Sequence, residues 1–220
     1  MLSEFSELFK KIKKLRSRYL NTLSAYKVYD CINNLSASNK VGKKKSSKNV
    51  ETLNDFKYFF IISKEACRCY FLIEIAKFFD RDTRALTVFN VLDYSEENLN
   101  KLTKEYFLRY HKDRKILPEL FKNYEELKLL DINKMREKIK LKRGLIEKLI
   151  TYRNKFLAHD DVNKIRINIT AKEVEQILNL IRGIIDIYYL KLDFSTNSYR
   201  NYKEMPVADT VRLIKYLQKH

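Results

Sequence analysis

The sequence predicts an all-α protein, because residues that favour tight turns are scarce and residues that favour helices are abundant. The 220 residues include only three Gly and two Pro, whereas Leu, Ile, Lys and Glu are frequent, which leaves few turns between long helices. Apolar side chains also recur at steps of three and four, the period of a helix with one apolar face. A chain of this length is expected to form one domain over residues 1–220.

The first helix is predicted to run to about Leu35, because apolar residues repeat at helical spacing from Leu2 onward. Its other face carries a row of basic residues, which we call the first-helix stripe. This stripe comprises Lys10, Lys11, Lys13, Lys14, Arg16 and Arg18. A phosphate backbone fits such a row, so we predict RNA contacts from Lys10, Lys11, Lys14 and Arg18, although a solvated helix face has the same pattern.

Residues 36–51 are polar, basic and without a helical period, so we expect a flexible loop there. Its run of Lys43, Lys44 and Lys45 either contacts nucleic acid or keeps the loop soluble. Thr52 is suited to cap a second helix that continues to about Asp80. This helix is apolar around much of its circumference, which predicts a central position.

Shorter helices are expected after residue 80. The run 80–83 can cap one of them, Ser95 can cap a second that ends near His111, and a third ends at Leu130. A long helix then continues to about Ala158. His111 itself lies in a charged segment and is expected at the surface.

The last part of the chain contains the clearest helix start. Thr170 and Glu173 have the spacing of a capping box, in which the hydroxyl and the carboxylate each accept a hydrogen bond from the other residue's exposed amide. This box is expected to open a helix through Tyr188. Residues 194–205 are expected to be a linker to a short C-terminal helix that starts at Pro206, where a first-turn proline is tolerated.

Charge and hydropathy narrow the class of partner. Basic residues number 45 against 28 acidic residues, which gives a net charge of +17 and favours a polyanion, with nucleic acid ahead of an anionic membrane. The longest apolar stretch, Cys69 to Phe79, contains Glu74 and Lys77 and is too short to span a bilayer. The N-terminus lacks the pattern of a secretory signal, so we expect a cytoplasmic protein. The three cysteines are expected to be reduced core thiols.

The segment from Tyr152 to Asp161, YRNKFLAHDD, is the candidate for chemistry. A projection of the long helix at 100° per residue places Arg153 and His159 within the apolar arc. A buried guanidinium is costly unless it meets an acceptor. That acceptor is Asp160 or Asp161, a carboxylate from another helix, a second copy of the chain, or a phosphate.

His159 follows Arg153 by six positions, which is about 120° around a regular helix, so the two side chains would diverge. A joint site therefore needs either a helix that ends near Ala158 or a second subunit. A purely structural alternative has Arg153 paired with Asp161 and His159 stacked on Phe156, which would only secure the helix end.

The string Arg153-Asn154-Lys155-x-x-Ala158-His159-x-Asp161 resembles the signature of HEPN domains. The likeness is to the abortive-infection, AbiU-type subfamily that is found in prokaryotic defence and toxin–antitoxin loci. Upstream, residues 66–80 resemble the helix that precedes the motif in that subfamily, and they end in the acidic Asp80. Together the two likenesses cover about residues 53–189.

The resemblance implies an antiparallel helical bundle, here with extra N- and C-terminal helices, that forms a homodimer through the motif helix. In active members such a domain is an endoribonuclease that needs neither metal nor cofactor. On this resemblance Arg153 binds the scissile phosphate, His159 transfers a proton, and Asn154 orients one of them. The products would carry 2′,3′-cyclic phosphate and 5′-hydroxyl ends.

Neighbouring residues have supporting roles on the same resemblance. Asp161 would hold the helix end or the imidazole tautomer, and Lys155 and Tyr152 flank the catalytic residues. The expected partners are RNA, a second copy of the chain and an antitoxin protein. The alternative is a catalytically silent HEPN module that binds RNA or a partner protein.

Overall fold

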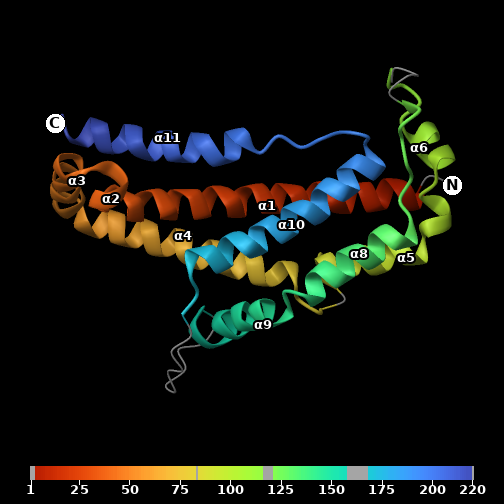
Figure 1. Cartoon of the computed structure of the whole chain (residues 1–220), viewed down its shortest axis with the longest axis horizontal. Helices are drawn as coiled ribbons and strands as arrows, with labels where there is room; N and C mark the ends of the chain where they lie inside the picture. The colour runs from red at the N-terminus through yellow and green to blue at the C-terminus, as the bar shows by residue number, and fades with distance from the viewer. Residues whose placement is uncertain (1–2, 83, 116–120, 158–167, 220) are drawn as a thin grey trace. The chain divides into compact units, whose positions relative to one another are not determined.

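The fold is known from a computed structural model that describes residues 3–82, 84–115, 121–157 and 168–219 (Figure 1). All regular structure in these four segments is helical, with no strand, which confirms the all-α prediction. None of the helices described in them is long and apolar enough to cross a membrane.

The chain divides into two compact units. The first unit contains residues 1–19 and 75–197, and the second contains residues 20–74 and 198–220. Helices α1 (Ser3–Leu35) and α4 (Lys57–Phe78) each contribute residues to both units. The single domain expected over residues 1–220 stays a prediction.

The first unit is built around the long helix α10. Its elements besides the ends of α1 and α4 are α5 (Val88–Glu97), η1 (Leu99–Lys101), α6 (Lys104–Tyr110), α8 (Leu129–Lys140), α9 (Arg143–Tyr152), η2 (Arg153–Leu157) and α10 (Ala171–Leu192). The core that excludes solvent is formed by apolar side chains of α1, α4, α5, α6, α8, α9 and α10. Fully buried members include Phe5, Ile12, Ile75, Leu92, Phe107, Ile132, Ile177, Ile181 and Tyr188.

Ser95 does not cap a helix, contrary to the prediction. It is buried within α5, where its hydroxyl donates to the Val91 carbonyl at 2.6 Å and lies 2.8 Å from the Tyr188 hydroxyl. The cap of α5 is Thr87, whose hydroxyl accepts from the Asn90 amide at 3.1 Å. A phenol from α10 thus satisfies a buried serine that the sequence pattern assigned to a helix end.

His111 is also not the surface residue that its charged neighbours suggested. Its side chain is only 10% exposed, and Nε2 lies 2.8 Å from the Leu192 carbonyl at the end of α10. The ring packs against Phe5, Phe9 and Phe107. An imidazole can be buried here because a helix-end carbonyl satisfies its nitrogen.

The expected loop at 36–51 is wrong, because this part of the second unit is helical. It forms α2 (Ser38–Val41) and most of α3 (Lys43–Asp55). The face of α3 that is buried is polar: Asn49 donates to the Leu35 carbonyl at 2.9 Å and Ser46 donates to the Ser36 carbonyl at 2.7 Å. A helix that packs through hydrogen bonds to the carbonyls of Leu35 and Ser36, at and just after the end of α1, has no apolar period to reveal it.

The linker predicted at 194–205 is too long, because α11 (Arg200–Leu217) begins well before Pro206. The proline therefore lies inside the helix, where it has no amide to donate to the Tyr202 carbonyl. The Ser24 hydroxyl, 3.4 Å away, donates to that carbonyl instead. This contact from α1 explains why a proline is tolerated at a position that normally ends a helix.

The central position predicted for the second helix holds only for the C-terminal part of α4. Ile75 and Phe78 are fully buried, whereas Tyr58 and Ile62 in its first turns are 80% and 66% exposed. Apolar residues occur all around α4, but they are not buried along the whole helix, because its first turns are covered on one face only.

Candidate functional site

The candidate site lies on a helical stretch that is interrupted twice, first by a break between α8 and α9 and then by the π-helix η2. The long helix expected to reach Ala158 breaks at Leu141 and Lys142, between α8 and α9. Ile146 and Leu149 bury one face of α9. The break lets α9 take a direction different from that of α8 (Figure 1). The residue that follows α9, Arg153, contacts Asp80 in the turn after α4.

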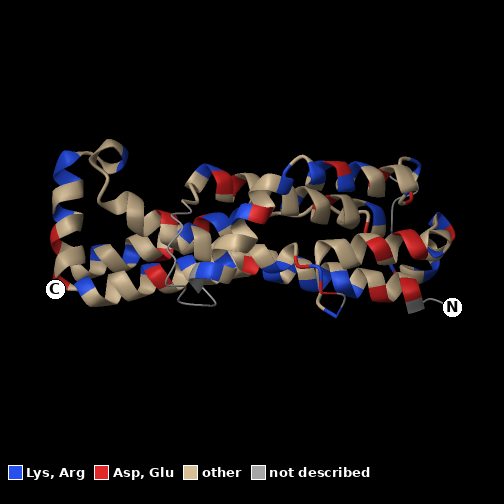
Figure 2. Cartoon of the chain, turned by 90° about the horizontal axis from the view of Figure 1, so that it is seen from below, with Lys and Arg blue, Asp and Glu red and all other residues tan. Residues whose placement is uncertain are grey.

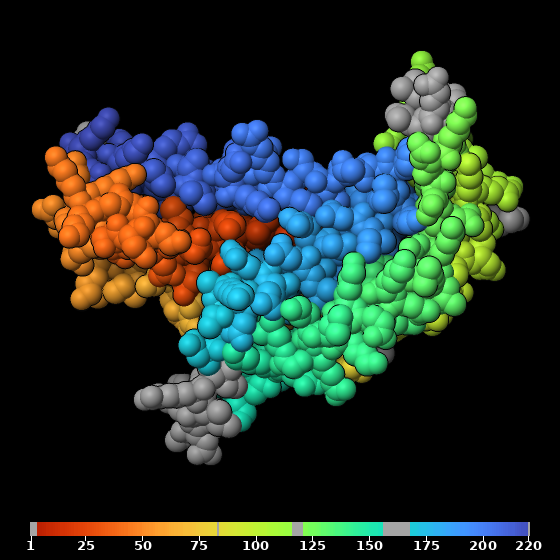
Figure 3. All heavy atoms as spheres, in the orientation of Figure 1, coloured from red at the N-terminus to blue at the C-terminus, as the bar shows by residue number. Residues whose placement is uncertain are grey.

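Helix α10 holds α9 in place through the predicted capping box. Thr170 accepts from the Glu173 amide and the Glu173 carboxylate accepts from the Thr170 amide, which confirms the box. The same carboxylate accepts from Lys148 of α9 at 2.5 Å, and Lys142 donates to Gln176 at 2.9 Å. The N-terminal half of α10 accordingly lies against α9 on the surface shown in Figure 3.

The end of α9 continues as the π-helix η2, which starts at Arg153. In a π-helix each amide donates a hydrogen bond to the carbonyl five residues earlier. Such segments are rare in proteins, but those that occur are often located at functional sites. The projection at 100° per residue therefore does not apply beyond Tyr152. His159, the second residue of the predicted pair, lies outside the described residues.

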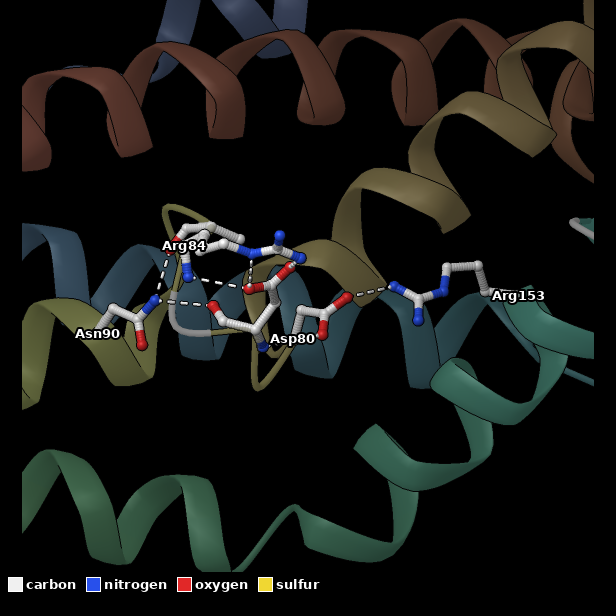
Figure 4. Close-up of polar contacts among 6 residues, drawn as sticks. Asp80, Arg84, Asn90 and Arg153 are labelled. Atoms are coloured by element: carbon white, nitrogen blue, oxygen red, sulfur yellow. Dashed lines mark hydrogen bonds and ion pairs between the residues drawn. The ribbon is translucent and has the colours of Figure 1, made fainter.

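Asp80 is the acceptor that Arg153 requires. Nη1 of Arg153 lies 2.9 Å from Oδ2 of Asp80, just past the end of α4 (Figure 4). Nε of Arg153 donates to the Asn154 side chain at 2.9 Å. The two charged side chains are 20% and 35% exposed. Of the acceptors considered from the sequence, the structure shows the carboxylate that follows another helix. Asp80 was noted in the family resemblance but was not assigned to the site.

The turn that carries Asp80 is held by hydrogen bonds of its own. The side-chain amide of Asn90 donates to the backbone carbonyls of Asp82 and Ala85, at 3.0 and 2.5 Å (Figure 4). The Asp82 backbone amide donates to the Asp80 carboxylate at 3.3 Å. The hydrogen bond from Arg153 is the main reason that the pKa of Asp80 lies below its usual range. Asp80 is therefore ionised at neutral pH and fixes the orientation of the guanidinium.

Arg153 and Asp80 line a pocket of about 550 Å³ between the turn after α4 and helices α5, α8 and α9. Five apolar side chains contribute to its lining: Phe79, Phe89, Ile139, Ile146 and Ile150. Five cations contribute as well, namely Arg81, Arg136, Lys140, Arg143 and Arg153, against the two carboxylates of Asp80 and Glu147. The sequence did not reveal this pocket, because its residues come from three separated segments.

The cations of the pocket are not equally available. Arg136 is paired with Asp93 at 2.8 Å and with Glu96, and Arg143 with Glu147 at 2.7 Å. Arg81 forms no ion pair within the described segments, and its guanidinium lies 5.3 Å from the centre of the Phe89 ring. The pocket therefore keeps a positive charge that its own carboxylates do not neutralise.

A model of the HEPN AbiU2 family matches residues 3–213. The chain belongs to the AbiU2 family of HEPN domains. The match confirms the resemblance to abortive-infection HEPN domains and also covers α1 and most of α11, which the sequence likeness left out. Searches of curated proteins and of solved structures gave no match.

The structure describes three of the other predicted catalytic and supporting residues of this AbiU2 chain, namely Tyr152, Asn154 and Lys155. Asn154 is exposed and bonded to Arg153, while Tyr152 and Lys155 are half-buried on either side of that pair. Asp161, like His159, lies outside the described residues. Within the described segments, no group of three or more His, Cys, Asp and Glu side chains is placed to hold a metal ion.

The predicted RNA contacts of the first-helix stripe differ in availability. Lys10 and Lys14 are exposed and form no ion pair with the described residues. Lys11 is paired with Glu7 at 2.7 Å. Arg18 donates to the Leu86 carbonyl at 2.9 Å and covers the Phe78 ring, so its guanidinium is committed to the fold.

Other basic residues lie outside this stripe. Lys43, Lys44 and Lys45 are exposed in the first turn of α3 rather than in a loop. Lys and Arg occur along many helices, interspersed with acidic residues (Figure 2). The net positive charge is therefore not confined to the first-helix stripe.

Proposed function

We propose that this AbiU2 chain is a metal-independent endoribonuclease of a prokaryotic defence or toxin–antitoxin system. The observation that carries the proposal is the Arg153 guanidinium, held by Asp80 and Asn154 at a cationic pocket. Membership of a HEPN abortive-infection family is the second support.

The chemistry follows from the donors that Arg153 keeps. Nε and Nη1 are occupied by Asn154 and Asp80, and Nη2 has no acceptor among the described residues. A scissile phosphate bound there would have the negative charge that builds on its oxygens stabilised by the guanidinium. Asp80 acts as a positioning residue, because it contacts Arg153 rather than the substrate.

In the proposed reaction the RNA 2′-oxygen attacks the adjoining phosphorus and the bond to the 5′-oxygen breaks. His159 either takes the proton of the 2′-hydroxyl or supplies a proton to the departing 5′-oxygen, since imidazole titrates near neutral pH. The products are a 2′,3′-cyclic phosphate and a 5′-hydroxyl. We also propose that two copies of the chain meet at the Arg153 helix and form a composite site.

The deciding experiment is RNA cleavage in EDTA by the purified chain, with mixed RNA and tRNA as substrates and the ends of the products mapped. We expect cyclic phosphate ends from the unaltered protein and a loss of at least about 100-fold in His159→Ala. Absence of cleavage, or full activity in His159→Ala, would sink the proposal. The composite site also predicts a dimer by analytical ultracentrifugation and a specific activity that falls on dilution.

A catalytically silent module that binds RNA is the second candidate, and exposed Lys10 and Lys14 favour it. In that case Lys10→Glu with Lys14→Glu weakens RNA binding and its salt dependence, while His159→Ala leaves binding intact. Lys215→Glu with Lys219→Glu makes the same charge change on α11 and just after it, and serves as the matched control. An antitoxin partner stays a prediction.

A further inference from the structure

The pocket beside Arg153 is more apolar than phosphate binding requires. A phosphate needs only the guanidinium and its neighbouring cations, yet the lining includes two phenylalanines and three isoleucines. Its volume of about 550 Å³ lies within the range of sites that enclose a small organic ligand. A lining that combines apolar side chains with cations suits a ligand that is flat and apolar at one end and anionic at the other.

One wall of the pocket offers a stacking surface. The Phe89 ring is half-buried, and the Arg81 guanidinium lies 5.3 Å from its centre. Phe79 meets the same ring edge to face at 6.4 Å and holds it in place. Nucleobases in single-stranded RNA are bound in this way, by stacking on aromatic rings and on arginine planes.

We propose that this pocket binds the base of a nucleotide that adjoins the scissile phosphate, with Phe89 and Arg81 as the stacking pair. The inference rests on the proposed function, because it takes the phosphate on Arg153 as the anchor. Since Arg153 lines the same pocket, a nucleotide whose phosphate contacts its free nitrogen has its base next to the apolar wall. Phe89 and Arg81 are then residues that determine which RNA sites are cut.

The test compares pocket variants with matched surface variants. Phe89→Leu removes the ring and Arg81→Ala removes the guanidinium, while Phe89→Tyr keeps a ring. Arg84→Ala is the control for Arg81, because Arg84 belongs to the same turn but pairs with Asp82 and does not line the pocket. Phe59→Leu, on the exposed part of α4, is the control for the loss of a ring.

Two readouts are measured in EDTA: the affinity for a short RNA, and the base preference at the positions that flank the cuts in a random-sequence RNA. We expect Phe89→Leu and Arg81→Ala to lower the affinity about 10-fold and to flatten one flanking preference. Phe89→Tyr and both controls should behave like the unaltered protein. An abasic residue at the same position should weaken binding to the unaltered protein but add little to Phe89→Leu.

The outcomes separate this inference from the proposed function. RNA that binds with the expected Phe89 and abasic dependence but is never cleaved would refute the ribonuclease and leave the pocket assignment standing. Cleavage with an unchanged base preference and affinity in Phe89→Leu would refute the pocket assignment alone. Saturable binding of free AMP that depends on Phe89, without any effect of Phe89→Leu on RNA, would also overturn the assignment to an RNA strand.

Discussion

Two ion pairs hold the same stretch of helix, and they differ in what their remaining atoms contact. Lys148 of α9 is paired with Glu173 of α10 at 2.5 Å, and Arg153 of η2 is paired with Asp80 at 2.9 Å. All four side chains are partly buried, and in each pair the cation lowers the pKa of the carboxylate. Distance and burial alone therefore do not separate a structural pair from a functional one.

The separation comes from the unused donors and acceptors. The Glu173 carboxylate also accepts from the Thr170 amide at 2.8 Å and from its hydroxyl at 2.9 Å, which occupies it within its own helix start. Arg153 instead keeps Nη2 without an acceptor among the described residues and lines a cationic pocket. The Lys148–Glu173 pair does not line the pocket and secures a helix, whereas the Arg153–Asp80 pair lines it and has an unused donor that can bind an anion.

The largest expected effect is the loss of RNA cleavage in Arg153→Lys. An ammonium cannot reproduce the planar contacts to Asp80, Asn154 and a phosphate at once, so we expect kcat/KM to fall by at least about 100-fold. Lys148→Arg is the matched change in the other pair and should leave cleavage unaltered. Equal losses in both variants would show that the two pairs do not differ in kind.

Asp80→Asn should have the next largest effect. The amide keeps an acceptor for Arg153 but removes the charge that fixes it, so we expect kcat to fall about 10-fold through misplacement of the guanidinium. KM should not rise, because the change also removes a negative charge beside the phosphate site. Steady-state kinetics separate the two constants, and a raised KM with unchanged kcat would assign Asp80 to substrate binding instead.

Sequence patterns predicted the two pairs to different extents, for physical reasons. The capping box around Glu173 is local, with four consecutive residues and a reciprocal geometry, so it was read directly. The need of Arg153 for an acceptor also followed from its place in an apolar arc. Its partner could not be chosen, because Asp80 is 73 residues away along the chain, and only the tertiary fold places the end of α4 beside η2.

The wrong predictions for residues 36–51, for the linker at 194–205 and for His111 have one cause. Each concerns a polar contact that produces no periodic pattern of apolar residues in the sequence. Helix α3 packs through Ser46 and Asn49, and α11 tolerates Pro206 because Ser24 reaches the carbonyl that the proline leaves unpaired. His111 is buried because its nitrogen meets the end of α10. In each case a polar side chain forms a hydrogen bond with a backbone carbonyl outside its own helix, which no apolar period encodes.

Thr170→Ala tests the Lys148–Glu173 pair by removing the hydroxyl that is hydrogen-bonded to Glu173. The loss of the hydroxyl that accepts from the Glu173 amide should lower the free energy of unfolding by about 1 kcal/mol, measured by urea denaturation. Cleavage per mole of folded protein should stay unchanged, because the cap only secures α10. Thr170→Ser restores an acceptor and serves as the control. A cleavage defect that persists in the folded variant would mean that α10 helps to place Arg153.

The smallest expected effect is the pH dependence that Glu173 contributes to stability. The hydrogen bond from Lys148, with those from Thr170, lowers the pKa of Glu173 from 4.5 to about 2 in the folded chain. The contribution is therefore fully present above about pH 4.5 and is lost as the pH falls toward about 2. It should be small because solvent screens a partly exposed pair. The difference in urea midpoint between the unaltered chain and Glu173→Gln should be smaller near pH 3 than at neutral pH. A difference that grows on acidification would contradict the assignment.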